Sequence, residues 1–137
     1  MTNLEIVAKK LAFMEQCLAD LRAKAKAEQF EDDLLQRRFA EHTLQLAIQA
    51  ALDVASHIVS DQRLGEPKTN AELFGALLRA GAVPQDLGAT LAKMAGFRNV
   101  LVHSYVDVDV GLLAEVVRNR LVELERFVSA IRTHLAL

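Results

Sequence analysis

Tryptophan is absent from this chain, and tyrosine, cysteine and proline are nearly so. The 137 residues include one tyrosine, one cysteine and two prolines, and aromatic residues make up only 5% of the total. With so few aromatic side chains, the core must consist of leucine, alanine and valine, which favours helices over a β-sandwich. The single cysteine, Cys17, excludes an internal disulfide and is too few for a zinc site. We expect Cys17 to act as a small buried apolar residue.

Long uncharged apolar stretches are also missing. No uncharged stretch approaches the roughly 20 residues that a membrane-spanning helix needs. The first twenty residues carry five charged side chains, unlike the apolar segment of a signal peptide. We therefore expect a cytoplasmic protein with no membrane partner.

The chain also lacks an excess of basic residues, since its formal net charge is −2. This argues against a protein that coats nucleic acid, because such binding depends on neutralising phosphates. A local site built from a few arginines in a cleft stays compatible with the charge. Apolar residues account for 52% and charged ones for 25%, the balance of a globular protein. We expect residues 1–137 to form a single domain.

Apolar residues recur with helical spacing along most of the chain. Helices are predicted over residues 4–27, about 33–60, 71–81, from Pro84 to about 105, and about 110–135. Residues 61–70 and 107–111 break the pattern. Thr69 or Asn70 can cap the short helix, and Gly81 is placed to end it. The expected fold is all-α, an antiparallel bundle of four main helices plus a short one.

The stretch GFRNVLVHSYVDVD, residues 96–109, sets four polar residues in an otherwise apolar segment. These residues are Arg98, Asn99, His103 and Tyr105. On a helix, Arg98 and Tyr105 share one face, while Asn99 and His103 are neighbours on the adjoining face. Arg98 and His103 diverge by about 140°, so they meet over one ligand only because arginine is long.

The residue types in this stretch suit an anion next to a proton-transfer group. A guanidinium binds phosphate in a fork, and histidine exchanges a proton near neutral pH. Residues 100–102 are expected to anchor the helix while the polar side chains face a groove. Structural roles stay open: His103 as a hydrogen-bonded core or interface residue, Arg98 paired with an acid on another helix, and Tyr105 with its ring buried.

HEPN domains carry a motif in which four residues separate an arginine from a histidine. RNVLVHSY resembles the R-N-x-x-V-H-x-Y form of this motif, in particular that of the HepT-like toxins of prokaryotic toxin–antitoxin pairs. The resemblance covers nearly the whole chain. It includes AIQAALDVASHIVS (47–60), GEPKTNAELFGALLRAGAVP (65–84) and LAKMAGFRNVLVHSY (91–105). It implies a small helical homodimer in which the motifs of both subunits face a shared cleft. Two copies of the motif would make that cleft locally cationic although each chain carries −2.

The same resemblance implies a metal-independent endoribonuclease that acts as a toxin. Arg98 would stabilise charge on the phosphate in the transition state, and Asn99 would orient the phosphate or the histidine. His103 would act as acid or base on the 2′-hydroxyl or the leaving oxygen, so that a cyclic 2′,3′-phosphate forms. No cofactor is expected, and the sequence has no metal-ligand spacing.

The resemblance also implies a partner. In HepT-like pairs a minimal nucleotidyltransferase antitoxin adds adenylate to the tyrosine two residues after the histidine, which is Tyr105 here. Such a modification would place negative charge and bulk beside the motif and exclude an RNA phosphate.

Two other functions stay open. A non-catalytic HEPN module could hold a nucleotide in the same groove, or serve a nucleotidyltransferase as platform or substrate. Alternatively, the stretch could be a polar seam between subunits, with no accessible cleft.

Further titratable residues lie outside the motif. Asp53 and His57, four residues apart on the second helix, could form an acid–imidazole pair beside the cleft, or a surface or interface pair. Surface positions are expected for His42, His134, Arg118, Arg120 and Arg126, with a place at the rim of the cleft open to the arginines.

Overall fold

The computed structural model describes residues 3–103 and 109–137, with the side chains of residues 102 and 103 left out. All regular secondary structure in the described part of the chain is helical, with no strand, as expected from the sequence. Its elements are α1 (Leu4–Lys24), the 3-10 helix η1 (Ala27–Gln29), α2 (Leu34–Asp61), α3 (Asn70–Arg79), α4 (Gln85–His103), α5 (Val110–Asn119) and α6 (Leu121–Leu135).

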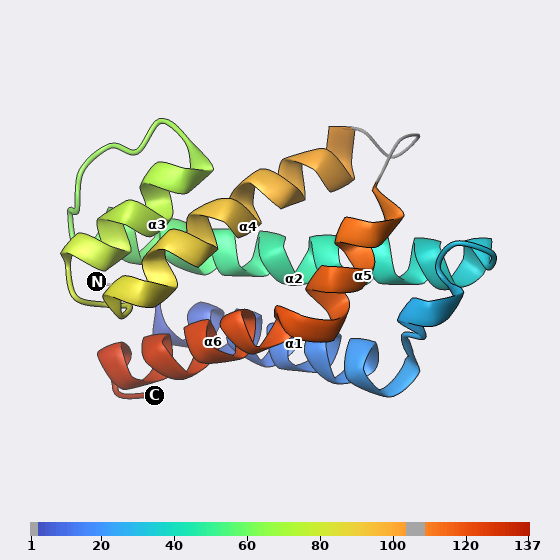
Figure 1. The fold of residues 1–137 in the computed structure, drawn as a ribbon. Coiled ribbons are helices and arrows are strands. Elements are labelled where there is room, and N and C mark those ends of the chain that lie inside the picture. The colour runs from blue at the N-terminus through green and yellow to red at the C-terminus, as the bar shows by residue number, and fades with distance from the viewer. Residues whose placement is uncertain (1–2, 104–108) are drawn as a thin grey trace.

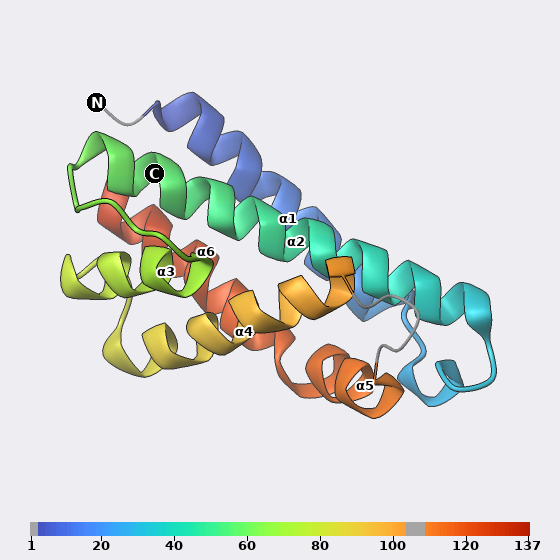
Figure 2. The ribbon, with the colours of Figure 1, turned by 90° about the horizontal axis from the view of Figure 1, so that it is seen from above.

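The helices surround α2, which lies in the middle of the molecule (Figure 1). α1 and α6 lie against one another on one side of α2, and α3 and α4 cover its other side. α1 and α2 are antiparallel neighbours and pack most extensively, as the view from above also shows (Figure 2). α5 crosses one end of the bundle and contacts both η1 and α2.

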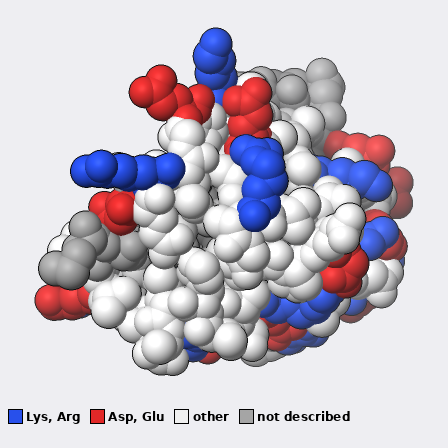
Figure 3. All heavy atoms as spheres, turned by 90° about the vertical axis from the view of Figure 1, so that its left-hand side faces the viewer, with Lys and Arg blue, Asp and Glu red and all other residues white. Residues whose placement is uncertain are grey.

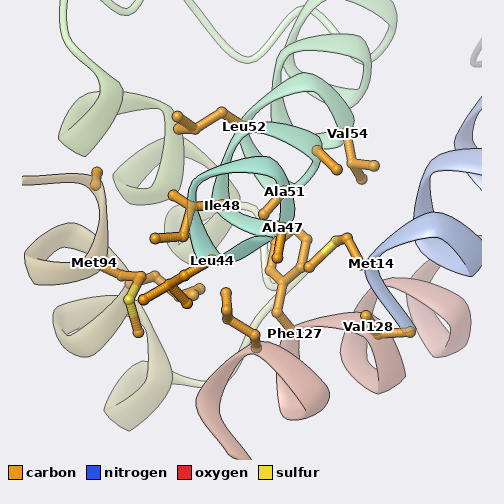
Figure 4. Packing of buried hydrophobic residues seen from close by; sticks show 14 of the residues in the cluster. Met14, Leu44, Ala47, Ile48, Ala51, Leu52, Val54, Met94, Phe127 and Val128 are labelled. Carbon is orange, nitrogen blue, oxygen red and sulfur yellow. The ribbon is translucent and has the colours of Figure 1, made fainter. Parts of the chain in front are cut away.

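α2 holds the centre because its apolar residues point in most directions, which is typical of a helix in the middle of a bundle. Five of its buried residues are alanines, whose small side chains let neighbouring helices approach closely. Around Ala47 and Ala51, the core includes Met14 from α1, Met94 from α4 and Phe127 from α6 (Figure 4).

The core also contains an aromatic pair and the single cysteine. Phe127 meets Phe74 of α3 edge to face, with ring centroids 5.9 Å apart. Cys17 is buried in the core as expected. Burial raises the pKa of its thiol, and the nearby charge of Asp20 raises it further.

The helix ends around α3 follow the local signals in the sequence. Thr69 is the residue that caps α3, since its Oγ1 accepts a hydrogen bond from the Glu72 amide at 3.1 Å, and Asn70 is the first helical residue. Gly81 turns the chain beyond α3 with a φ of +77°, a conformation that favours glycine. Pro84 was predicted to lie within the next helix, but α4 begins one residue after it.

The larger differences from the prediction concern the end of α1 and the last predicted helix. α1 ends at Lys24 because Ala25 is extended, with φ −76° and ψ 131°. The segment predicted as one last helix is divided at Arg120, with φ −114° and ψ −5°. α5 packs on η1 and α2, whereas α6 packs on α1 and α4. The chain bends there because one straight helix could not bury apolar residues against neighbours in both directions.

Figure 3 shows the end of the bundle that lies opposite the last turn of α4. Neither acidic nor basic side chains dominate this face. Acidic and basic side chains alternate around the edge of that face, and uncharged ones occupy its middle. Among the described residues, no helix has the length and apolar character needed to cross a membrane.

Candidate active site

α4 presents Arg98 on the face that packs against the rest of the protein. Leu91, Met94 and Leu101 share this face and are all buried. Asn99 is exposed on the adjoining face, as the helical spacing predicted. The prediction that residues 100–102 anchor the helix holds for Leu101, whereas Val100 is 38% exposed, and the side chain of residue 102 lies outside the described part.

The guanidinium of Arg98 is held by amide oxygens. Its Nη2 donates a hydrogen bond to Oε1 of Gln49 on α2 at 2.6 Å. Its Nη1 donates to Oδ1 of Asn99 at 3.3 Å, on the exposed side of the helix. Nε is buried and has no partner among the described residues. Among residues 3–103 and 109–137, no acidic side chain forms an ion pair with Arg98, and its described hydrogen-bond partners are both uncharged amides.

Gln49 is in turn connected to α1 by two hydrogen bonds. Its Nε2 donates to Oδ1 of Asp53 at 2.9 Å. Oδ2 of Asp53 accepts from Nζ of Lys10 at 3.1 Å. Arg98, Gln49, Asp53 and Lys10 therefore form one chain of hydrogen bonds across α4, α2 and α1, which we call the Arg98 network.

The structure places Asp53 in this network rather than against His57. The half-buried His57 lies one turn further along α2, and no hydrogen bond joins these two described side chains. A role for His57 beside the cleft stays a prediction.

Sequence reasoning did not single out Gln49 and Lys10. One signal was present: Gln49 and Asp53 are four residues apart in the apolar segment AIQAALDVA and so share a face of a central helix. Polar side chains at such positions need partners when they are partly buried.

His103 is the last residue of α4, but its side chain lies outside the described residues, as does the whole of Tyr105. Their roles stay predictions based on the motif.

The three arginines between residues 118 and 126 lie at the surface, as expected. Arg118 is exposed. Arg120 pairs with Glu123 at 2.9 Å, and Arg126 pairs with Asp86 of α4, also at 2.9 Å.

The other two histidines, for which surface positions are expected, are His42 and His134. His42 is exposed. His134 is half-buried, with its Nε2 3.2 Å from Oε1 of Gln62. In the part of the chain that the structure describes, no three His, Cys, Asp or Glu side chains cluster in a way that could hold a metal ion.

The Arg98 network is open to solvent on the side of α1. A groove with a volume of ≈ 340 Å³ lies between α1 and α2. Its lining residues are Lys9, Lys10, Phe13, Leu46, Gln49, Ala50 and Asp53. Solvent therefore reaches the groups that hold Arg98 in place.

Residues 14–131 match the family described as ribonuclease HepT-like. The chain belongs to the HepT-like family. This confirms the resemblance drawn from the RNVLVHSY motif and its flanking stretches.

Two HepT nucleases resemble this HepT-like chain over most of its length. It is 29% identical over 129 residues to the mRNA nuclease HepT of Shewanella oneidensis, covering 93% of this chain and 97% of that protein. It is 33% identical over 113 residues to the tRNA nuclease HepT of Aphanizomenon flos-aquae, covering 80% and 77% respectively.

A solved structure has the same fold as this HepT-like protein. It is the tri-AMPylated HEPN toxin of Shewanella oneidensis in complex with the MNT antitoxin, with a TM-score of 0.86 and 28% identity. The likeness covers 97% of this chain and 99% of that one.

Proposed function

We propose that this HepT-like protein is an endoribonuclease, the toxin of a toxin–antitoxin pair whose antitoxin is an MNT-type nucleotidyltransferase. Two similar proteins are an mRNA nuclease and a tRNA nuclease. The similar solved structure is of a HEPN toxin that is tri-AMPylated and in complex with an MNT antitoxin. The observation in this chain that carries the proposal is Arg98, whose guanidinium is held by neutral amide oxygens and so keeps its charge for a phosphate.

The reaction needs an anion-binding group and a proton-transfer group, and the motif supplies both. The 2′-oxygen of RNA bonds to phosphorus while the bond to the 5′-oxygen breaks. The 2′-hydroxyl loses its proton to a base, and the 5′-oxygen receives one from an acid. His103 serves as one of these two groups, and Arg98 stabilises the charge that builds on the phosphate. Asn99, exposed beside Nη1 of Arg98, orients the phosphate or the histidine.

A homodimer with both motifs at one cleft is part of this proposal. Val100 and Asn99 are exposed on the outer side of α4. Apart from the adjacent residues and the backbone of α4 itself, no described atom comes within 4 Å of the place that a Gly96 side chain would occupy, which leaves room for another helix to approach closely there. Light scattering of the purified protein tests the dimer.

We expect the protein to act in the cytoplasm, where it would meet its RNA substrate.

Cleavage is tested with purified protein, unmodified at Tyr105, and a mixed RNA pool in the presence of EDTA. We expect the parent to leave cyclic 2′,3′-phosphate ends and the folded His103→Ala variant to leave none. Cleavage that EDTA abolishes would contradict the metal-independent mechanism. Intact RNA with both folded proteins would favour a non-catalytic module that binds a nucleotide or its partner enzyme.

Modification of Tyr105 is tested separately, and the chain contains no other tyrosine. After co-expression with an MNT-type partner, mass spectrometry should reveal one or more adenylate-sized additions. These should be absent from the Tyr105→Phe variant. Additions that persist in the variant would place the modification elsewhere.

A further inference from the structure

We propose that Gln49 is a positioning residue for Arg98: its amide oxygen orients the guanidinium without neutralising it. This inference rests on the proposed ribonuclease function. It follows from the 2.6 Å hydrogen bond between Arg98 Nη2 and Gln49 Oε1, which joins α4 to α2.

The chemistry of the neighbours determines which way the Gln49 amide faces. A carboxylate only accepts hydrogen bonds and a guanidinium only donates them. The NH₂ group of Gln49 must therefore face Asp53, and its oxygen must face Arg98. The opposite orientation would place donor against donor at Arg98 and acceptor against acceptor at Asp53. Lys10 compensates the charge of Asp53 at 3.1 Å, so the carboxylate is held on the α1 side of Gln49.

An amide suits this position better than an acid would. A glutamate at position 49 would form an ion pair with Arg98, which would compete with the phosphate for the same guanidinium. A neutral acceptor fixes the geometry and leaves the charge available, and fixed geometry is what stabilises a transition state most effectively.

Among the described residues, the hydrogen bond to Gln49 is the one that joins the guanidinium of Arg98 to another helix. Its Nε is buried and has no acceptor among the described residues. Its remaining bond goes to Asn99, the next residue on the same helix, and is long at 3.3 Å. Without Gln49, nothing described on another helix would hold the guanidinium, and it would turn toward water.

The Gln49→Met variant tests this dependence, because it keeps the length of the side chain and removes the amide. Gln16→Met is the matched control, since Gln16 donates to Asp20 four residues later on α1 at 2.9 Å, as Gln49 does to Asp53, but does not contact Arg98. We expect kcat for RNA cleavage to fall roughly 10- to 100-fold in Gln49→Met, with a smaller change in KM. Gln16→Met should cleave at the parent rate. A Gln49→Met variant that is folded and cleaves like the parent overturns the proposal.

A second variant, Gln49→Glu, separates positioning from neutralisation. Near neutral pH its carboxylate should pair with Arg98 and reduce cleavage at least as far as methionine does. When protonated, the same carboxyl offers an oxygen to Arg98 and an O–H to Asp53, as the amide does. The ratio of variant to parent kcat/KM should therefore rise as the pH falls toward about 5. A ratio that does not change with pH would indicate that Gln49 only supports the fold.

A spectroscopic measurement tests the positioning role of Gln49 without an activity assay. In ¹⁵N-edited NMR spectra, the guanidinium signals of Arg98, assigned by their loss in Arg98→Lys, should report restricted rotation in the parent and free rotation in Gln49→Met. An inactive parent with a restrained Arg98 would refute the ribonuclease and retain the positioning role. Free rotation in the parent would refute the positioning role whatever the activity.

Discussion

Nζ of Lys10 on α1 lies 3.1 Å from Oδ2 of Asp53 on α2. This pair forms the end of the Arg98 network that is farthest from the motif. Their side chains are 34% and 39% exposed, so the pair contributes less than about 1 kcal/mol to stability. Its importance is geometric. It holds the carboxylate that orients Gln49, so the packing of α1 on α2 affects the position of a side chain on α4.

Replacing Arg98 by alanine should abolish most of the ribonuclease activity and leave the fold intact. Removing one group that stabilises the charge of a transition state lowers kcat by about 10²- to 10³-fold. Cleavage rates and growth inhibition on expression measure the effect. Arg118→Ala removes an exposed arginine from α5 and should retain both. Equal activities in the two variants would refute the assignment of Arg98.

Shortening Phe127 to alanine should destabilise the protein by about 3–5 kcal/mol, because the ring is fully buried and packs edge to face on Phe74. Denaturant unfolding followed by circular dichroism gives the free energy of unfolding. Phe13→Ala is the control: Phe13 is 45% exposed, and its loss should cost less than about 1 kcal/mol. Similar losses in both variants would contradict the packing described for α6.

The Asp33→Ala variant should lose about 1 kcal/mol of stability, because Asp33 caps the central helix. Its Oδ1 accepts hydrogen bonds from the amides of Leu35 at 3.0 Å and Gln36 at 3.2 Å. Chemical denaturation should show no comparable loss for Asp32→Ala, since Asp32 lies exposed in the turn just before the cap. If the neighbouring substitution costs as much, the capping role is wrong.

Glu41 should make stability depend on pH. Burial raises the pKa of its carboxyl above the ordinary 4.5, and the charges of Arg37 and Arg38 only partly oppose this. The folded state therefore binds the proton more tightly than the unfolded state. This contribution to stability is fully present below pH 4.5 and is lost as the pH rises through the raised pKa.

We therefore expect Glu41→Gln, which resembles the protonated acid, to be more stable than the parent near neutral pH and equal to it in acid. Urea unfolding of both proteins across this range measures the difference. Glu31→Gln, at an exposed position in the turn before α2, should differ from its parent by less than about 0.5 kcal/mol. A difference between Glu41→Gln and the parent that stays constant with pH would contradict the prediction.

Most of the secondary structure could be predicted because helix formation depends on local features. The spacing of apolar residues located α1 to α4 and the segment that forms α5 and α6, Gly81 marked the end of α3, and Thr69 was one of two predicted caps. The bend at Arg120 could not be predicted in this way. The apolar spacing continues across it, and only the positions of the neighbouring helices require two helices there.

The same distinction applies to the site. The order of residues alone is enough to make Arg98 and Asn99 neighbours on one helix and to identify the motif as HepT-like. That Gln49, 49 residues away from Arg98, is its partner becomes visible only in the folded protein. A hydrogen bond between helices depends on how far each helix is shifted and rotated relative to the other. The apolar period shows which face of a helix is buried, but it does not show which residues of two faces meet.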